Sequence, residues 1–459
     1  MHELDLPTDK KKKVLIETWG CQMNVADSEN MLSMLQKENY TLTNKEADAD
    51  LVLLNTCHIR EKAKHKVLSR LGKLKELKVL KPSMKIAVSG CVAQAEGKKL
   101  LKSAPQIDVL FGPGKILDFP QLLKENAKTK LPTMAIGFKR ESTSYPEVET
   151  NNTVKPSISG KFETGRYVNI TQGCDNFCTF CVVPFTRGRE ISRKPLDIIK
   201  ECQSLLDDGA KEITLLGQNV NSYGSDLVES DSIENPFMSL LEQVASLPKL
   251  VRLRFTTSNP HDFTRSLSNL FSTEDKLGTY LHLPVQSGND EVLRRMKRKV
   301  TADEYLEKVS WLRNSNPNFA LSTDLIVGFP GETEAQFEDT LKLVEKVRFN
   351  FIFAFMYSPR KNTAAIRFPD QVPEEVKQQR LRRLNQLQDK ITVQLNENEI
   401  GKTSEVLFAY PSKKEENCYY GRTKEFRLVK VSSSTPLVGL VREVKITNAN
   451  KIALLGELS

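Results

Sequence analysis

The sequence predicts an α/β protein in three parts: an N-terminal open parallel α/β sheet, a central repeat of six strands and helices, and a small C-terminal antiparallel β-barrel. Two stretches of alternating strand-like and helical segments, separated by a polar region, indicate two parallel α/β structures. Short strands without helices between them follow residue 401, which is typical of a small all-β module. The length of 459 residues fits about three domains, which we place at residues 12–128, 160–396 and 397–459.

The composition is that of an ordinary globular protein, with 39% hydrophobic and 27% charged residues. A net charge of +9 fits a polyanionic partner such as nucleic acid. No apolar run approaches the roughly 20 residues of a membrane span, and the polar first residues lack the apolar segment of a secretory signal. Eight cysteines are too few for a disulfide scaffold in a chain of this length. We therefore expect a cytoplasmic protein with reduced thiols.

The N-terminal third contains strand-like runs that are each followed by a helical segment. This alternation predicts βαβ units in a parallel sheet. The runs cover residues 13–18, 50–55 and 84–89, the helical segments cover residues 25–37, 61–80 and 93–102, and a further run covers residues 107–111.

Three cysteines of this region, Cys21, Cys57 and Cys91, each follow one of the predicted strands. Ligands of open parallel sheets gather at the carboxyl ends of strands, so the three thiols should converge on one edge of the sheet. We call them the N-terminal cysteine triad. The alternative is three unrelated buried thiols, which are common in cores. His58 and His65 could add ligands, although both also fit ordinary surface positions.

Residues 118–160 are rich in Lys, Thr, Ser, Asn and Pro, which predicts a loop and a domain boundary. Beyond it the β/α alternation resumes. The predicted strands cover residues 166–171, 212–216, 251–256, 280–283, 321–327 and 351–356. Six repeats are fewer than the eight of a closed TIM barrel.

A second group of cysteines, Cys174, Cys178 and Cys181, follows the first strand of this repeat with the spacing C-x₃-C-x₂-C. We call residues 173–181 the cysteine loop. Structural zinc and thiolate-bound iron–sulfur clusters normally take four protein ligands, so three thiolates leave one position open for a substrate. The alternatives are a zinc knuckle that lacks a ligand and cysteines that pack as small apolar residues.

Two stretches of the central region, residues 186–194 and 294–299, are strongly basic. Clustered Lys and Arg beside a site suit phosphate contacts. A solvated surface is the alternative for both. We expect the first stretch, which includes Arg187 and Arg189, to face the substrate.

The C-terminal part begins with a long polar helix over residues 373–398, whose leucine and isoleucine stripe should pack on the central repeat. Predicted strands at residues 405–410, 426–431, 437–446 and 451–455 then form the small antiparallel barrel. Cys202 and Cys418 have no partners by spacing, and we interpret both as structural.

The cysteine loop, with Phe180 before its last cysteine, resembles the signature of radical S-adenosylmethionine (SAM) enzymes. Longer motifs surround the N-terminal cysteine triad: Trp-Gly-Cys-Gln-Met-Asn at residues 19–24, Asn-Thr-Cys-His-Ile-Arg-Glu at residues 55–61 and Ser-Gly-Cys-Val-Ala-Gln at residues 89–94. They resemble the motifs of the methylthiotransferase branch of that family. The resemblance extends over almost the whole chain, and Tyr-Tyr-Gly-Arg-Thr at residues 419–423 is similar to the turn of its TRAM domain.

This resemblance implies a partial (β/α)6 radical SAM barrel and two 4Fe-4S clusters. Cys174, Cys178 and Cys181 would hold the cluster that cleaves SAM, and Cys21, Cys57 and Cys91 would hold the second cluster, which serves sulfur transfer. Gly217, Gln218 and Ser287 would contact SAM, although turn chemistry alone also explains them. The TRAM domain would bind RNA through Lys413, Lys414, Arg422, Lys424 and Arg427, with Tyr419 or Tyr420 as a stacking platform.

The implied reaction is methylthiolation of C2 of N6-isopentenyladenosine at position 37, in the anticodon loop of tRNA. The alternatives are a methylthiotransferase for threonylcarbamoyladenosine in tRNA or for a ribosomal-protein aspartate, and a non-enzymatic, zinc-holding RNA-binding protein. We expect a monomer without membrane contact that receives electrons from a donor such as a flavodoxin or ferredoxin.

Overall fold

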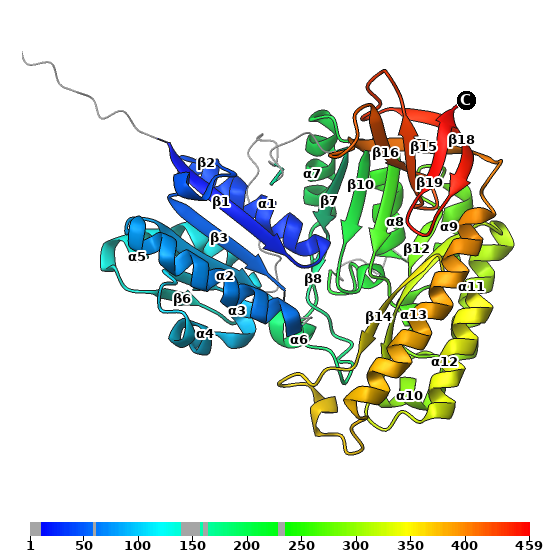
Figure 1. Ribbon diagram of the computed structural model, residues 1–459, viewed down its shortest axis with the longest axis horizontal. Coiled ribbons are helices and arrows are strands. Elements are labelled where there is room, and N and C mark those ends of the chain that lie inside the picture. Colours follow the sequence, from blue (N-terminus) through cyan, green and yellow to red (C-terminus); the bar gives the residue numbers. More distant parts are fainter. Residues whose placement is uncertain (1–10, 58–60, 139–156, 159–163, 228–234) are drawn as a thin grey trace, which may run out of the picture. The chain divides into compact units, whose positions relative to one another are not determined.

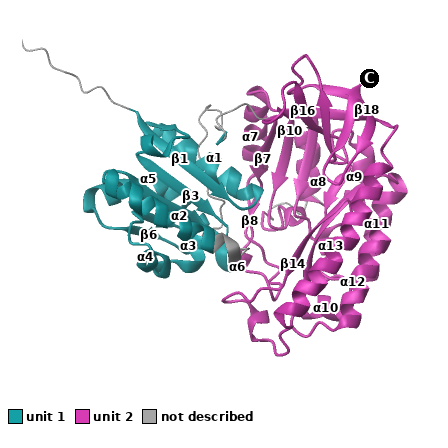
Figure 2. Ribbon diagram, viewed as in Figure 1, with its two compact units in different colours: residues 1–162, 185–188 teal, residues 163–184, 189–459 magenta. Residues whose placement is uncertain are grey.

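The computed structural model describes residues 11–57, 61–138, 157–158, 164–227 and 235–459. Its chain forms two compact units. Unit 1 comprises residues 1–162 and 185–188, and unit 2 comprises residues 163–184 and 189–459 (Figure 2). Part of the segment that follows the cysteine loop, residues 185–188, therefore belongs to unit 1.

Unit 1 contains a six-stranded sheet in the order β2-β1-β3-β4-β5-β6, and every neighbouring pair is parallel (Figure 1). This confirms the predicted open parallel sheet. Its strands are β1 (Lys12–Trp19), β2 (Tyr40–Leu42), β3 (Leu51–Thr56), β4 (Lys85–Gly90), β5 (Val109–Phe111) and β6 (Thr133–Ala135).

Helices cover both faces of this sheet because its central strands are apolar on both sides. On β3, Val52 and Leu54 pack with Leu71 of α2, whereas Leu51 and Leu53 pack with Met31 of α1. The helices are α1 (Gln22–Lys37), α2 (Glu61–Leu80), α3 (Cys91–Glu96), α4 (Lys98–Ser103) and α5 (Phe119–Thr129), with 3-10 turns at Glu46–Asp48 and Pro113–Asp118. The prediction of a loop over residues 118–160 was wrong in its first part, where α5 and β6 lie.

Unit 2 contains all six predicted central strands, arranged as two three-stranded parallel sheets, β11-β10-β7 and β12-β13-β14. Their bounds agree with the sequence prediction within two residues at each end. The strands are β7 (Gly165–Asn169), β10 (Glu212–Leu216), β11 (Arg252–Thr256), β12 (Tyr280–His282), β13 (Ala320–Val327) and β14 (Phe351–Met356), and a short antiparallel pair, β8 (Thr171–Gln172) and β9 (Ile191–Ser192), adjoins them.

The helices around these strands bury a single large hydrophobic cluster against them. The helices are α7 (Pro195–Asp207), α8 (Pro236–Ala245), α9 (Arg265–Thr273), α10 (Asp290–Arg295), α11 (Ala302–Ser315), α12 (Glu334–Val347) and α13 (Glu374–Glu397), with 3-10 turns at Val220–Ser222, Pro260–Asp262 and Ala364–Arg367. The short helix α6 (Val183–Thr186) has residues in both units. The stripe of α13 packs as predicted, because Leu384 and Ile391 are buried in that cluster.

The C-terminal residues of unit 2 form a closed five-stranded barrel, which we call the small barrel. Its strands are β15 (Thr403–Pro411), β16 (Cys418–Arg422), β17 (Leu428–Ser432), β18 (Val441–Ala449) and β19 (Leu454–Leu458), joined in the order β15-β16-β17-β19-β18. The prediction missed β16, whose tyrosines were interpreted as a turn. The prediction of an antiparallel barrel was also incomplete, because β17 and β19 pair in parallel, whereas the other strand pairs are antiparallel.

The small barrel packs against the amino ends of core strands within unit 2. Arg252, the first residue of β11, donates from Nη1 to the Arg422 carbonyl oxygen at 2.8 Å. Arg254 donates from Nη2 to the Thr423 carbonyl oxygen at 2.9 Å. The cysteine loop follows the opposite, carboxyl end of β7, so the two features lie at opposite ends of the core. Within the described residues, every helix is too short or too polar to cross a membrane.

Candidate active site

The N-terminal cysteine triad lies at the carboxyl ends of three adjacent strands, as predicted. Cys21 is the N-cap of α1 after β1, Cys57 directly follows β3, and Cys91 is the first residue of α3 after β4. The strand ends are level, since Thr56 pairs with both Trp19 and Gly90. The sheet order places β2 on one side of β1 and β3 on the other, so Cys21 and Cys57 flank the point where the winding direction reverses. Ligands of open α/β sheets bind at such points.

Two glycines allow the strand ends to approach this closely. Gly90 has φ +91°, and a Cβ placed there would lie 2.3 Å from the Thr56 carbonyl oxygen. A Cβ at Gly20 would lie 2.8 Å from the Cβ of Cys57. A side chain at either position would force the segments that carry the cysteines apart.

The buried guanidinium group of Arg187 lies beside this triad, within unit 1. It is 4% exposed and donates from Nη2 to Asp27 Oδ2 at 2.8 Å and to Asn24 Oδ1 at 3.0 Å. Burial raises the pKa of Cys91, whereas the charge of Arg187 and a hydrogen bond from it lower the same pKa. Arg187 therefore provides a fixed positive charge for thiolates in a site that otherwise disfavours them.

This position corrects the prediction that residues 186–194 form a substrate-facing basic surface. Arg187 is buried in an ion pair, and Arg193 forms another with Glu201 at 2.6 Å. Arg189 is exposed as expected, and it pairs with Asp175 of the cysteine loop at 2.6 Å. The sequence gives the charges of these residues but not their carboxylate partners.

The cysteine loop lies in unit 2, after β7 and β8, and N–H groups point toward each of its sulfur atoms. Asn176 donates from Nδ2 to Cys174 Sγ at 3.5 Å, and the Val183 backbone N–H donates to Cys181 Sγ at 3.5 Å. Arg298 donates from Nη1 to Cys178 Sγ at 3.8 Å. Such hydrogen bonds stabilise anionic sulfur and tune the potentials of iron–sulfur clusters.

Thr179 anchors the loop to the rest of unit 2. Its backbone N–H donates to the Met296 carbonyl oxygen at 3.0 Å and its hydroxyl to the Arg295 carbonyl oxygen at 2.9 Å. Its own carbonyl oxygen accepts from the Ala365 N–H at 2.9 Å. Three bonds to one short residue fix the loop between its second and third cysteines.

Burial disfavours the thiolate form of two cysteines of this loop. Burial raises the pKa of Cys174 and raises the pKa of Cys181 to about 12. Thiols must lose their protons to bind a metal, so the positive charge of bound iron is what would stabilise these groups as thiolates. Among the residues that the structure describes, no three His, Cys, Asp or Glu side chains gather closely enough to hold one metal ion. A cluster distributes its cysteine ligands over several iron atoms, and two sets of three thiols have the donor chemistry for two clusters.

The predicted SAM-contacting residues lie at other strand ends of unit 2. Gly217 follows β10, and a Cβ there would lie 2.5 Å from Thr171 Oγ1. Gln218 accepts a hydrogen bond from the backbone N–H of Gly173, the first residue of the cysteine loop. Ser287 is fully buried with its hydroxyl 3.4 Å from that of Thr340. Contact of these three residues with SAM stays a prediction.

Sequence reasoning missed Glu190 and Arg298, which lie inside the two basic stretches. Glu190 follows the cysteine loop and shares a hydrogen bond with the Ser222 hydroxyl. Burial, together with Asp175, Asp226 and Asp262, raises its pKa to about 7. Glu190 lies among basic residues, so the sequence alone did not indicate a buried acid there. Arg298 is one of several basic residues in its stretch, so the sequence alone did not indicate that it donates to a cysteine sulfur.

The expected basic face of the small barrel is only partly exposed. Arg422 lies over the Phe426 ring at 4.0 Å, and Arg427 donates to Asn396 Oδ1 at 2.9 Å, so both are engaged in packing. Lys413 and Lys414 are exposed. Tyr420 stacks on Tyr410, which is 48% exposed and is the ring that offers a free face.

The two histidines proposed as extra ligands remain without support. His65 is exposed on α2. His58 lies outside the described residues.

Two family models match the chain. The model described as "Uncharacterized protein family UPF0004" matches residues 13–112, and that of the Radical SAM superfamily matches residues 168–344. The first covers the N-terminal cysteine triad and the second covers the cysteine loop.

Similar proteins match over nearly the full chain. The tRNA-2-methylthio-N(6)-dimethylallyladenosine synthase of Moorella thermoacetica is 43% identical over 452 residues, covering 98% of each chain. The proteins of that name from Clostridium botulinum and Geotalea uraniireducens are 43% and 41% identical, covering 96% and 98% of this chain and 96% and 99% of their own.

Solved structures share the fold at low sequence identity. The radical SAM methyltransferase TsrM from Kitasatospora setae, solved with cobalamin and a [4Fe-4S] cluster, has a TM-score of 0.54 and 12% identity. The match covers 78% of this chain and 74% of TsrM. With these relatives and both cysteine sites in place, the chain belongs to the family of tRNA-2-methylthio-N(6)-dimethylallyladenosine synthases.

Proposed function

We propose that this protein methylthiolates C2 of N6-isopentenyladenosine at position 37 of tRNA. The observation that carries the proposal is the presence of two separate three-cysteine sites, each at the carboxyl end of parallel strands, in a chain 43% identical to enzymes named for that product. One site would serve SAM cleavage and the other sulfur transfer.

The donor sets suit two iron–sulfur clusters, with Cys174, Cys178 and Cys181 as the ligands of one and the N-terminal cysteine triad as the ligands of the other. When bound, the clusters supply the electron that cleaves SAM into a radical able to remove hydrogen from the unactivated adenine C2, and a second site from which sulfur is delivered. The chain itself holds, orients and shields these groups.

The residues around each site have distinct tasks in this proposal. Asn176 and Arg298 stabilise the sulfur atoms of the cysteine loop by donating hydrogen bonds. Gln218 holds the loop by accepting from its first N–H, and together with Gly217 and Ser287 it lines the SAM site. Arg187 balances the negative charge of the N-terminal cysteine triad.

The substrate base must leave its stack to reach a buried site, which single-stranded loops permit more readily than duplexes. The anticodon loop of tRNA meets that requirement. The exposed lysines and Tyr410 of the small barrel would add contacts to the RNA backbone and bases. A flavodoxin or ferredoxin as electron donor, a monomeric state and a cytoplasmic location complete the proposal.

Two triple variants test this division of labour. Replacing Cys21, Cys57 and Cys91 by Ala should remove about half of the bound iron and all methylthiolation, while SAM is still cleaved to 5′-deoxyadenosine. Replacing Cys174, Cys178 and Cys181 by Ala should remove the other half of the iron and abolish SAM cleavage itself. Equal loss of SAM cleavage in both variants, with the iron content as stated, would contradict separate roles.

A further inference from the structure

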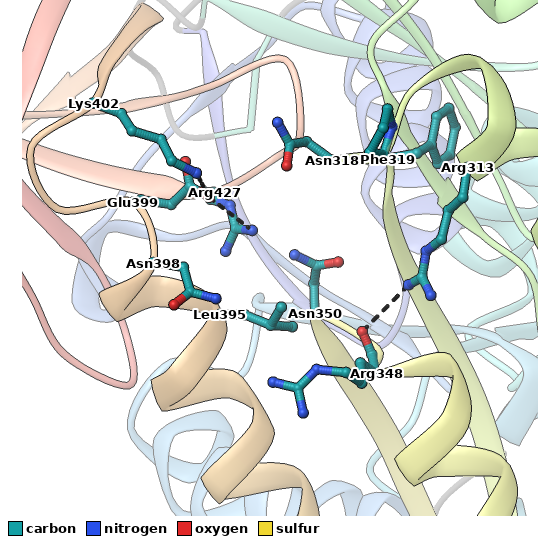
Figure 3. Close-up of a pocket in the computed structure, with 11 residues that line it drawn as sticks. Arg313, Asn318, Phe319, Arg348, Asn350, Leu395, Asn398, Glu399, Lys402 and Arg427 are labelled. Atoms are coloured by element: carbon teal, nitrogen blue, oxygen red, sulfur yellow. Dashed lines mark hydrogen bonds and ion pairs between the residues drawn. The ribbon is translucent and has the colours of Figure 1, made fainter.

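A pocket of about 240 Å³ lies in unit 2 between the core and the small barrel. Arg313 at the end of α11, Arg348 after α12, and Asn350 before β14 form its core side. Lys402 and Arg427 come from the edge of the small barrel. Figure 3 shows the guanidinium group of Arg427, the carboxamide of Asn350 and the side chain of Arg348 around one open space, each from a different segment.

The pocket has an excess of positive charge. Four cations line it, Arg313, Arg348, Lys402 and Arg427, against one carboxylate, that of Glu399. Glu399 is already shared, since it lies 3.3 Å from Lys402 Nζ and 3.6 Å from Arg427 Nη2. The charges of Arg313 and Arg348 are therefore not balanced by the pocket itself.

Among the described residues, the hydrogen bonds of these two arginines go to neutral acceptors. Arg313 donates from Nη2 to the Arg348 carbonyl oxygen at 3.5 Å, and Arg348 donates from Nη2 to Gln394 Oε1 at 2.9 Å. Within the described part of the chain, neither arginine forms an ion pair. Burial and the nearby charge of Arg348 lower the pKa of Arg313, in keeping with a guanidinium group that lacks a counter-charge.

Like charges held together in a partly buried pocket repel each other, and a bound anion relieves that repulsion. Guanidinium groups present planar pairs of N–H donors that match phosphate oxygens. The pocket is open to solvent and large enough for one phosphate group. It also joins the core to the small barrel, so a bound anion would bridge the two.

We propose that this pocket binds one phosphate of the RNA substrate's backbone. The inference rests on the proposed function for the identity of the polyanion, and the net charge of +9 agrees with such a substrate. The pocket lies before the amino ends of β13 and β14, whereas the cysteine loop follows a carboxyl end. A phosphate contact there supplies affinity and register for a long substrate and takes no part in the chemistry.

The first test removes the two unbalanced charges. In R313Q/R348Q, tRNA binding in a filter assay should weaken about tenfold at moderate salt. The slope of log affinity against log salt should fall by about 0.7–0.9, the value for one lost phosphate contact. The matched control is K249Q/K342Q, which removes two exposed cations that pair with Asp207 and Asp339 and should bind nearly as the parent does.

A second variant, Asn350→Asp, separates binding from folding. Asn350 Oδ1 accepts the Leu321 N–H at 3.0 Å, and an aspartate oxygen can accept the same bond. The new carboxylate would offset one of the two unbalanced positive charges of the pocket, so the melting temperature should stay equal or rise while tRNA binding weakens. A residue with only a structural role would not raise stability and lower RNA affinity together.

Inorganic phosphate distinguishes the possible sources of the anion. We expect phosphate to raise the melting temperature of the parent protein but not of R313Q/R348Q, with SAM cleavage in the absence of RNA unchanged in every variant. If phosphate raises the melting temperature of the parent protein while both pocket variants bind tRNA as the parent does, the pocket binds a free anion and the proposal is overturned. Unchanged tRNA binding without any phosphate shift overturns it as well. A parent protein that binds no tRNA refutes the proposed function, and the phosphate shift then still reports on the pocket.

Discussion

Breaking the buried ion pair between Arg187 and Asp27 should open the site of the N-terminal cysteine triad. Both side chains are at most 6% exposed, and their nitrogen and oxygen atoms lie 2.8 Å apart. In Arg187→Gln the Asp27 carboxylate loses the interior ion pair with Arg187. Removing one member of a buried pair costs about 3–5 kcal/mol. The neutral pair R187Q/D27N should recover most of that loss, because neither charge then remains buried.

The assay is hydrogen–deuterium exchange of the reconstituted protein under anaerobic conditions. Peptides from α1, which carries Asp27, should exchange roughly 100-fold faster or more in R187Q, since each 1.4 kcal/mol changes the opening equilibrium about tenfold. Peptides from α12, in unit 2, should not change and serve as the internal reference.

The matched control is Arg189→Gln, two residues further along the chain. The Arg189 side chain is 70% exposed and its pair with Asp175 lies on the surface, so its loss should cost less than about 1 kcal/mol. If α1 exchanges equally in R187Q and R189Q, the Arg187 pair does not hold this site together. Loss of iron from R187Q but not from R189Q would connect the pair to cluster binding.

Two further predictions concern unit 2. Because burial raises the pKa of Glu190 from 4.5 to about 7, its contribution to stability is complete below pH 4.5 and is lost as the pH rises through 7. Glu190→Gln should therefore match the parent at pH 4 and exceed its unfolding free energy by roughly 3 kcal/mol at pH 8, and a constant difference across that range would show that folding does not raise the pKa of Glu190. Arg254 is 2% exposed at its side chain and bonds Glu212 Oε2 at 3.0 Å and the Thr423 carbonyl oxygen at 2.9 Å. Arg254→Gln should loosen the small barrel, measured as faster exchange of β16 with the exchange of β13 unchanged, and equal protection of β16 in both proteins would contradict that role.

The sequence predicted the parallel strands well because such strands are buried on both faces. A run such as residues 50–55 is short and contains four consecutive apolar residues, Leu51 to Leu54, and it becomes β3 (Leu51–Thr56), whose residues are all buried. The same alternation placed Cys21, Cys57 and Cys91 at strand ends, since each cysteine lies two or three residues beyond the end of a predicted run.

The errors arose where burial depends on a distant partner. Arg187 lies in a basic stretch, yet Asp27, 160 residues earlier, removes it from the surface. Arg422 and Arg427 have the positive charge expected of an RNA-binding face, but Arg422 lies over the Phe426 ring and Arg427 donates to Asn396. β16 was missed because residues 419–423 were interpreted as a turn from their resemblance to the TRAM domain, and Gly421 lies within the strand. A Cβ at that position would lie 2.6 Å from the Leu407 carbonyl oxygen, so the glycine serves close strand packing.

The most direct test of the proposed function is nucleoside mass spectrometry on tRNA treated with reconstituted protein, SAM and a strong reductant without oxygen. Isopentenylated tRNA and the same tRNA without the isopentenyl group are compared in parallel. We expect a methylthio product only on the isopentenylated tRNA, with 5′-deoxyadenosine formed alongside it. No product on either tRNA, with SAM still cleaved, would contradict the proposed substrate and move it to threonylcarbamoyladenosine or to a protein side chain.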